Sequence, residues 1–143
     1  MSTASNIVAA IKTALETISG LSVVRGRPSS LTEGPSGACV WLAAGDLTSE
    51  YGPELTGYSH TLLVDLVGVV VAGSEFGDRE DAVLTLASQI TQVIETSTGL
   101  VALLTVAPVV GQRVQPDAIG MPGYAALAVV VQCQWLSDSG GGL

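Results

Sequence analysis

The feature of the sequence that most constrains the fold is a pair of amphipathic helical patterns, each followed by a Gly-Leu step. Apolar residues recur at helical spacing in residues 6–18 and 78–98, and they form one stripe in each segment. Gly20-Leu21 and Gly99-Leu100 fit a helix stop in which a left-handed glycine precedes an apolar residue. Each helix has to bury its stripe against another element, so the chain requires a layered fold around a core.

Strand patterns fill the segments between and after the helices. The predicted strands lie at residues 21–25, 38–44, 58–72, 103–115 and 124–136. The third and fifth of these carry apolar residues on both faces, which indicates burial on both sides for part of their length. Pro108 breaks the fourth, so part of it is expected at a sheet edge. The order predicts an α+β fold: an antiparallel-rich sheet of four to five strands, with two helices packed on one face and a projecting β-hairpin.

The projecting hairpin is predicted at residues 45–57, between the second and third strands. Gly52-Pro53 lies at its centre, and the segment from Tyr51 to Glu54 fits a tight turn. The arms are polar and would extend beyond the core, which is costly unless something packs on them. The hairpin is therefore the candidate surface for contact with another subunit, through Tyr51, Gly52, Pro53, Glu54 and Leu55.

The chain carries little charge. Of its 143 residues 13% are charged, where an ordinary soluble domain has about 25%. The low value reflects either a mild bias of composition or a surface largely covered by neighbours in an assembly, and we favour the second interpretation. The length suits one domain, placed at residues 1–136, and the Gly-rich residues 137–143 form a tail that is expected to be disordered in isolation.

The net charge of −8 argues against a protein that grips nucleic acid. The five basic residues are scattered, whereas binding to a phosphate backbone needs clustered lysine and arginine. An acidic surface can still face nucleic acid and repel it. The longest apolar run, residues 61–72, contains Asp65 and is shorter than the ~20 residues of a membrane-spanning helix. The first segment has no basic start and no cleavage site, so we expect folding in a cytoplasm.

No catalytic constellation is recognisable, and no enzyme activity, cofactor or metal is expected. Ser59, His60 and Asp65 are close in sequence, but on one strand His60 and Asp65 point to opposite faces. Cys39 and Cys133 lie in apolar strand-like runs and are expected to be buried free thiols. Two cysteines and one histidine do not make a zinc site.

Two further groups of residues are given structural interpretations. An acidic group precedes or opens the second helix, where the helix dipole favours negative charge; it consists of Glu75, Asp78, Glu80 and Asp81. Trp41 and Trp135 are expected in the core. Tyr51 and Tyr58 are left as possible interface anchors, because aromatic residues are enriched in interfaces.

The order of these elements along nearly the whole chain resembles the tail-terminator, or tail-completion, proteins of long-tailed bacteriophages. The pattern comprises an amphipathic first helix, a Pro-bearing loop, a strand, a protruding hairpin, a long strand and an acidic-capped helix that reads D-x-E-D-A-V-x-x-L-A-x-x-I from Asp78. It closes with a strand pair that has a small-residue start at Gly123-Tyr124-Ala125-Ala126 and an aromatic end at Trp135. The family has no diagnostic short motif and no catalytic residues to transfer.

The resemblance implies a structural virion protein that forms a hexameric ring on the head-proximal end of the tail tube. Such a ring stops tube polymerisation and offers the surface that the head-tail connector protein joins. Its partners would be itself, the tail-tube protein and the connector, and DNA would pass through its centre without specific binding. It would be assembled in the host cytoplasm and located in the virion tail or neck, with no membrane partner. Glu50 and Glu54 are the candidate acids of the lumen.

Two alternatives remain open at this point. The chain could form another ring of the same particle, either a tail-tube subunit or a head-tail connector. The helix predicted at residues 78–98 argues mildly against a tube subunit, which would carry a more continuous antiparallel barrel. The chain could also be a small ligand-binding or enzymatic α+β domain, which would need a pocket with convergent polar groups.

Overall fold

The computed structural model describes residues 2–27, 37–52, 57–73, 75–117 and 123–137. Its elements, in chain order, are α1 (Thr3–Glu16), β1 (Leu21–Arg25), β2 (Ala38–Gly52), β3 (Gly57–Val71), α2 (Phe76–Glu95), α3 (Thr98–Val101), β4 (Val109–Gln115) and β5 (Tyr124–Ser137). The strands form one five-stranded sheet in the order β1-β2-β3-β5-β4. The α+β prediction is confirmed. The sheet is antiparallel except for the pairing of β1 with β2, which is parallel.

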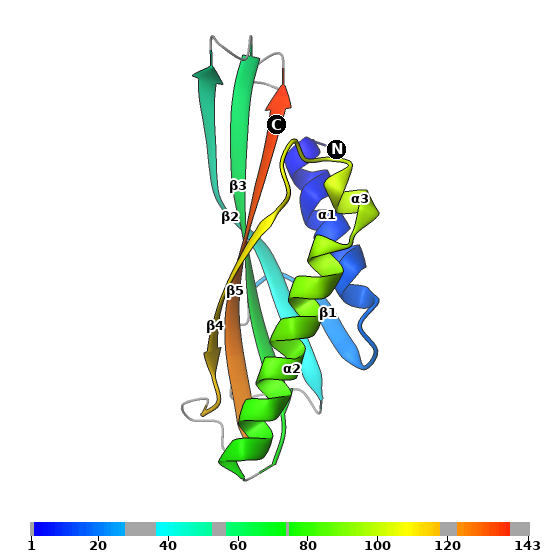
Figure 1. The fold of residues 1–143 in the computed structure, drawn as a ribbon, viewed down its shortest axis with the longest axis vertical. Coiled ribbons are helices and arrows are strands. Elements are labelled where there is room, and N and C mark those ends of the chain that lie inside the picture. Colours follow the sequence, from blue (N-terminus) through cyan, green and yellow to red (C-terminus); the bar gives the residue numbers. More distant parts are fainter. Residues whose placement is uncertain (1, 28–36, 53–56, 74, 118–122, 138–143) are drawn as a thin grey trace.

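Both long helices lie on the same face of the sheet, as predicted (Figure 1). The core lies between this helical layer and the sheet. On the helix side it is built from Ile7, Ile11, Leu15, Ile90 and Ile94, and on the sheet side from Leu42, Leu62, Leu66 and Val131, all at most 1% exposed. Every second residue of β3 and β5 points into this layer, because successive side chains of a strand alternate between its faces.

The helix boundaries differ in part from the predicted ones. Ser2 caps α1 through its side-chain oxygen, which accepts from the backbone N–H of Ser5 at 3.1 Å. The helix ends at Glu16 with Thr17 as its C-cap, so the predicted stop at Gly20 is wrong, although Gly20 has a left-handed φ of 77° in the turn that leads to β1. The four acids are spread more widely than predicted: Glu75 is the N-cap residue of α2 and only Asp78 lies in its first turn.

The predicted stop at Gly99 is wrong. Helix α2 ends at Glu95, and Gly99 lies inside the short helix α3. Ser97 caps α3 by accepting a hydrogen bond from the N–H of Leu100 at 3.2 Å, and the side chain of Leu100 is fully buried. A second capping site and the burial of one leucine therefore restart the helix where the Gly-Leu step predicts its end.

The predicted fourth strand and the predicted place of Trp41 also need correction. Strand β4 begins at Val109, directly after Pro108, and residues 103–108 are not strand. Trp41 is half-buried on the sheet face away from the helices, in register with Val67, whereas Trp135 is 4% exposed and belongs to the core as predicted. A period of two does not say which face of a strand the helices will cover.

Candidate functional site

The candidate site is the end of the sheet that leads from the core to beyond the helices (Figure 1). It consists of residues 47–52 of β2, 57–62 of β3 and 133–137 of β5, and we call it the extension. The register pairs Tyr51 with Tyr58 and Tyr58 with Ser137, so three strands run side by side. The predicted hairpin therefore has a third strand along one arm, and Ser137, assigned to the tail from sequence, belongs to β5. An isolated two-stranded hairpin is only marginally stable in water, and a third strand stabilises it.

A β-bulge marks the point where β2 enters the extension. Ala44 pairs with Val64 and Leu47 with Leu62, so β2 carries one more residue than β3 across this step. Gly45 lies in the bulge, where a Cβ would meet the Asp65 carboxylate oxygen Oδ2 at 2.8 Å and the Leu63 carbonyl at 3.0 Å. Arg27 reaches the same place and lies 3.4 Å from both the Ala44 carbonyl oxygen and Asp65 Oδ2. The bulge thus requires a residue without a side chain.

Replacement of Gly45 by alanine is expected to lower the free energy of unfolding by about 1–2 kcal/mol, because the new methyl group overpacks against the Asp65 carboxylate and the Leu63 carbonyl. Chemical denaturation measures the change. Gly111→Ala is the matched control, since Gly111 also lies in a strand but the nearest atom to its Cβ position is 4.0 Å away. Equal stability of the two variants would contradict a close approach at the bulge.

His60 is the centre of the extension and is fully buried. Its Nδ1 lies 2.7 Å from Ser49 Oγ on β2, and its Nε2 lies 2.6 Å from Ser137 Oγ on β5. A neutral imidazole has one donor and one acceptor, and a hydroxyl can act as either, so both ring nitrogens are satisfied in either tautomer. The imidazole therefore links the middle strand of the extension to both of its neighbours.

Aromatic rings continue from His60 in both directions along the same sheet face. The His60 ring centroid lies 5.3 Å from that of Trp135 and 6.4 Å from that of Tyr58, and Tyr58 and Tyr51 are 5.3 Å apart. Trp135 at the inner end is buried, whereas Tyr51 at the outer end is 62% exposed. The exposed ring of Tyr51 is thus held by ring contacts with its neighbours. Exposed aromatic side chains of this kind often anchor protein interfaces.

Thr105 binds the free edge of β5 where the extension begins. Its backbone N–H donates to the Gln134 carbonyl at 2.9 Å, and its Oγ1 accepts from the Leu136 N–H at 3.1 Å. Residues 103–108, predicted as strand, thus still bind backbone groups of β5. They do so through one backbone hydrogen bond and one side-chain hydrogen bond instead of a strand ladder. This connection fixes the third strand of the extension to the body of the molecule.

The sequence-derived contact residues fall in two groups. Tyr51 and Gly52, expected in the turn, belong to β2. Pro53, Glu54 and Leu55 lie outside the described residues. Glu50 is exposed and lies on the opposite sheet face from Tyr51 and His60, in register with Ser59. The sequence reasoning missed Ser49 and Ser137 as partners of His60, because their contact depends on strand register.

The other candidate chemical groups are not brought together. His60 and Asp65 point to opposite sheet faces, as expected, and Asp65 forms an ion pair with Arg27. Cys39 and Cys133 are free and buried, and burial raises the pKa of both thiols, that of Cys133 to about 11. A thiol with such a pKa carries little thiolate near neutral pH. Within the described ranges no three His, Cys, Asp or Glu side chains gather where a metal could bind.

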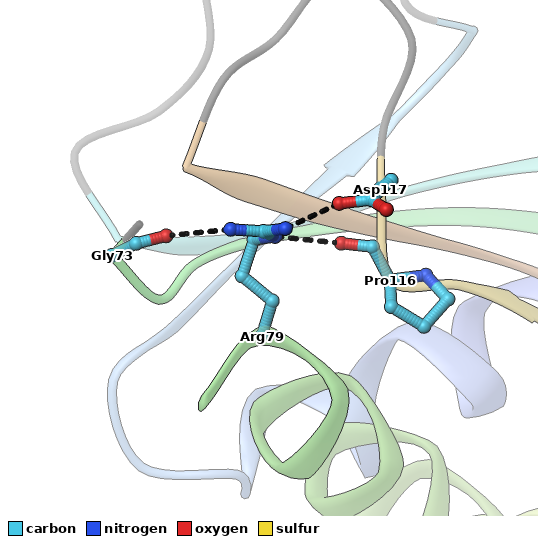
Figure 2. Close-up of polar contacts among 4 residues, drawn as sticks. All are labelled: Gly73, Arg79, Pro116 and Asp117. Atoms are coloured by element: carbon cyan, nitrogen blue, oxygen red, sulfur yellow. Dashed lines mark hydrogen bonds and ion pairs between the residues drawn. The ribbon is translucent and has the colours of Figure 1, made fainter. Parts of the chain in front are cut away.

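A second polar cluster, centred on Arg79, closes the opposite end of the molecule. The guanidinium binds the carbonyl oxygens of Pro116 at 3.1 Å and Gly73 at 3.4 Å and the carboxylate of Asp117, as Figure 2 shows. The Arg79 side chain is 12% exposed. It therefore ties the turn between β3 and α2 to the end of β4.

Comparison with known proteins gives no relative from which a function could be transferred. No protein-family model matches the chain, and no curated protein matches it. None of the helices in the described residues combines the length and apolar character needed to span a membrane.

Proposed function

We propose that this protein is a tail terminator of a long-tailed bacteriophage, forming a ring on the head-proximal end of the tail tube. The observation that carries the proposal is the extension, which holds Tyr51, 62% exposed, at the end of a three-stranded arm beyond the helices. A neighbour that packs on such an arm would bury its exposed aromatic side chain. The low charge of the chain, 13%, supports extensive contact between subunits.

The mechanism of termination is geometric. A head-to-tail interface relates each subunit to the next by a rotation. The subunits close into a ring when a whole number of such rotations makes a full turn, and six copies are expected here. Such a ring matches the end of the tail-tube protein but offers no further copy of the polymerising surface. Its other side joins the head-tail connector protein. The ring would be assembled in the host cytoplasm and remain in the neck of the virion.

The acidity of the chain suits a channel through which DNA passes without binding. The net charge is −8, and a negative wall repels a phosphate backbone. Glu50 is exposed on the extension, so it remains a candidate for the lumen together with Glu54. Neither residue needs to contact a base or a phosphate in this role.

Tyr51→Ala is expected to leave the fold unchanged and to lower ring formation at a given concentration by about tenfold or more, because exposed aromatic anchors dominate interface energies. The measurement is electron microscopy of the protein mixed with tail tubes assembled from the tail-tube protein of the same genome. The wild-type protein should form rings at one tube end and fix the tube length. Deletion of residues 51–54 should give a folded protein that does not assemble.

Val101→Ala provides the control, since Val101 is a large apolar residue with 46% exposure on α3, outside the extension, the sheet and α2. It should form rings and cap tubes like the wild type. Normal rings from the Tyr51 variant and the deletion would refute the role of the extension. A wild-type protein that stays monomeric and binds no tube end would refute the terminator, and polymerisation into tubes would identify a tube subunit instead.

A further inference from the structure

The sheet face away from the helices carries apolar side chains on β1, β2, β3 and β5 beside the Arg27–Asp65 ion pair, although antiparallel sheets with one open face usually carry polar residues there. One row runs across all five strands in register: Val24, Trp41, Val67, Ala128 and Arg113. We call this row, with the adjacent Val130, the open face. Val24 is 45% and Val130 40% exposed. An exposed apolar surface of this kind marks a site of interaction.

The open face is hollowed beside Arg113. A depression of about 390 Å³ is lined by Val67, Ala128 and Arg113 of the open face, together with Val114, Gln115, Ala126 and Leu127. Arg113 is exposed and forms no ion pair with the other described residues, whereas Lys12, Arg27 and Arg79 each pair with a carboxylate. The hollow therefore fits an apolar side chain that is accompanied by a carboxylate.

The same chain carries a surface of that description on α2. Four exposed residues lie on one side of the helix, because a step of four or seven residues along a helix returns to nearly the same angle about its axis. They are Glu80, Leu84, Ser88 and Glu95. We call them the outer stripe. Leu84 is 48% exposed, and neither glutamate belongs to an ion pair within the described part of the chain.

The two surfaces match in size and in kind. The 20 residues of α2 extend about 30 Å at 1.5 Å per residue. Five strands about 4.8 Å apart span about 19 Å, so one helix is long enough to cross the sheet. The covered face of the same sheet already packs against helices. A helix from outside would complete the second layer on the open face.

We propose that the open face binds the outer stripe of α2 of a second copy of this chain, with Leu84 in the hollow and a glutamate beside Arg113. This inference rests on the proposed ring, to which it adds a contact between neighbouring subunits beside that of the extension. Because α2 covers the opposite face of the sheet, the open face and the exposed side of α2 look in different directions. Each subunit then presents its open face to one neighbour and its outer stripe to the other. Such a head-to-tail arrangement builds rings, whereas a two-fold dimer uses the same surface on both subunits.

Disulfide trapping tests the contact directly. Ala128→Cys places a thiol in the open-face row and Ser88→Cys places one in the outer stripe, and both positions are exposed. An equimolar mixture under mild oxidation should give at least tenfold more cross-linked dimer than either variant alone. The wild-type protein, whose Cys39 and Cys133 are buried, controls for unspecific oxidation.

A charge reversal tests the chemistry of the contact. Arg113→Glu should weaken self-association at least tenfold in sedimentation experiments, and adding Glu80→Lys with Glu95→Lys should restore most of it. Arg25→Glu makes the same charge change at an exposed arginine outside the row and should associate like the wild type. A higher salt concentration should weaken the self-association of the wild-type protein, because dissolved ions screen exposed ion pairs.

The outcomes separate this inference from the proposed function. Rings that form normally in the Arg113→Glu variant, or cross-links mainly between two copies of Ala128→Cys, would overturn the docking of α2 and leave the terminator standing. A wild-type protein that never self-associates would overturn both. Rings that cap tubes, together with cross-links between positions 88 and 128, would support both.

Discussion

Replacement of His60 by alanine is expected to lower the free energy of unfolding by about 3 kcal/mol. Loss of a buried ring of this size leaves a cavity, for which aromatic-to-alanine substitutions typically cost about 3–5 kcal/mol. The hydroxyls of Ser49 and Ser137 also lose their hydrogen bonds to the imidazole. Ser49 is exposed and can bind water instead, which places the expected value at the lower end. Denaturant unfolding with linear extrapolation measures the difference.

A second substitution separates the hydrogen bonds of His60 from its volume. His60→Phe keeps a ring beside Trp135 and Tyr58 but bonds neither serine, so it is expected to lose about 1–2 kcal/mol. Hydrogen exchange should be faster in residues 47–52 of either variant and unchanged in α1. Thr61→Ala, next in the strand and on the other face, is the control. An alanine variant at position 60 as stable as this control would show that the imidazole does not hold the extension together.

Replacement of Arg79 by methionine is expected to lower the free energy of unfolding by about 2–3 kcal/mol. Methionine retains the apolar stem but leaves the carbonyl oxygens of Gly73 and Pro116 without the guanidinium (Figure 2). The contribution of Asp117 is small, since its side chain is 67% exposed and solvent screens the pair. For a chain of this length the melting temperature should fall by about 5–10 °C.

Lysine at position 79 is expected to recover only part of this loss. A point charge with a flexible stem cannot reach the two carbonyl oxygens in the fixed geometry of the guanidinium. Arg25→Met is the matched control, because Arg25 is exposed, and it should change stability by less than about 0.5 kcal/mol. A fall in melting temperature equal to that of the control would mean that the Arg79 cluster does not join the β3–α2 turn to β4.

The elements predicted correctly are those with a strong local signal. The stripes of α1 and α2 and the alternation in β3 and β5 recur over many residues, so neighbouring positions support the same conclusion. The errors arose where contacts with distant parts of the chain outweighed the local sequence pattern. Gly99 is a plausible helix stop, but the burial of Leu100 and the cap from Ser97 favour another helical turn. In residues 103–108 the bonds of Thr105 to β5 replace a strand.

The candidate site was predicted in outline and not in composition. Polar residues around Gly52-Pro53 indicated a hairpin, and β2 and β3 do pair there, whereas the contact role of Tyr51 stays a prediction. The link from His60 to Ser49 and Ser137 could not be predicted, because it joins residues 11 and 77 positions apart. Such contacts depend on the register of three strands, and a shift by one residue would turn His60 to the other face.

The sequence by itself determined the α+β class, the two helices and the apolar character of both faces of the sheet, because periodicity and composition are properties of neighbouring residues. Only the tertiary structure decided which face the helices cover, and it thereby left Trp41 and Val130 on the open face and buried His60. It also added β5 to the predicted hairpin and turned it into the extension. These features rest on pairings between distant segments, which are fixed by packing of the whole chain and not by any local pattern.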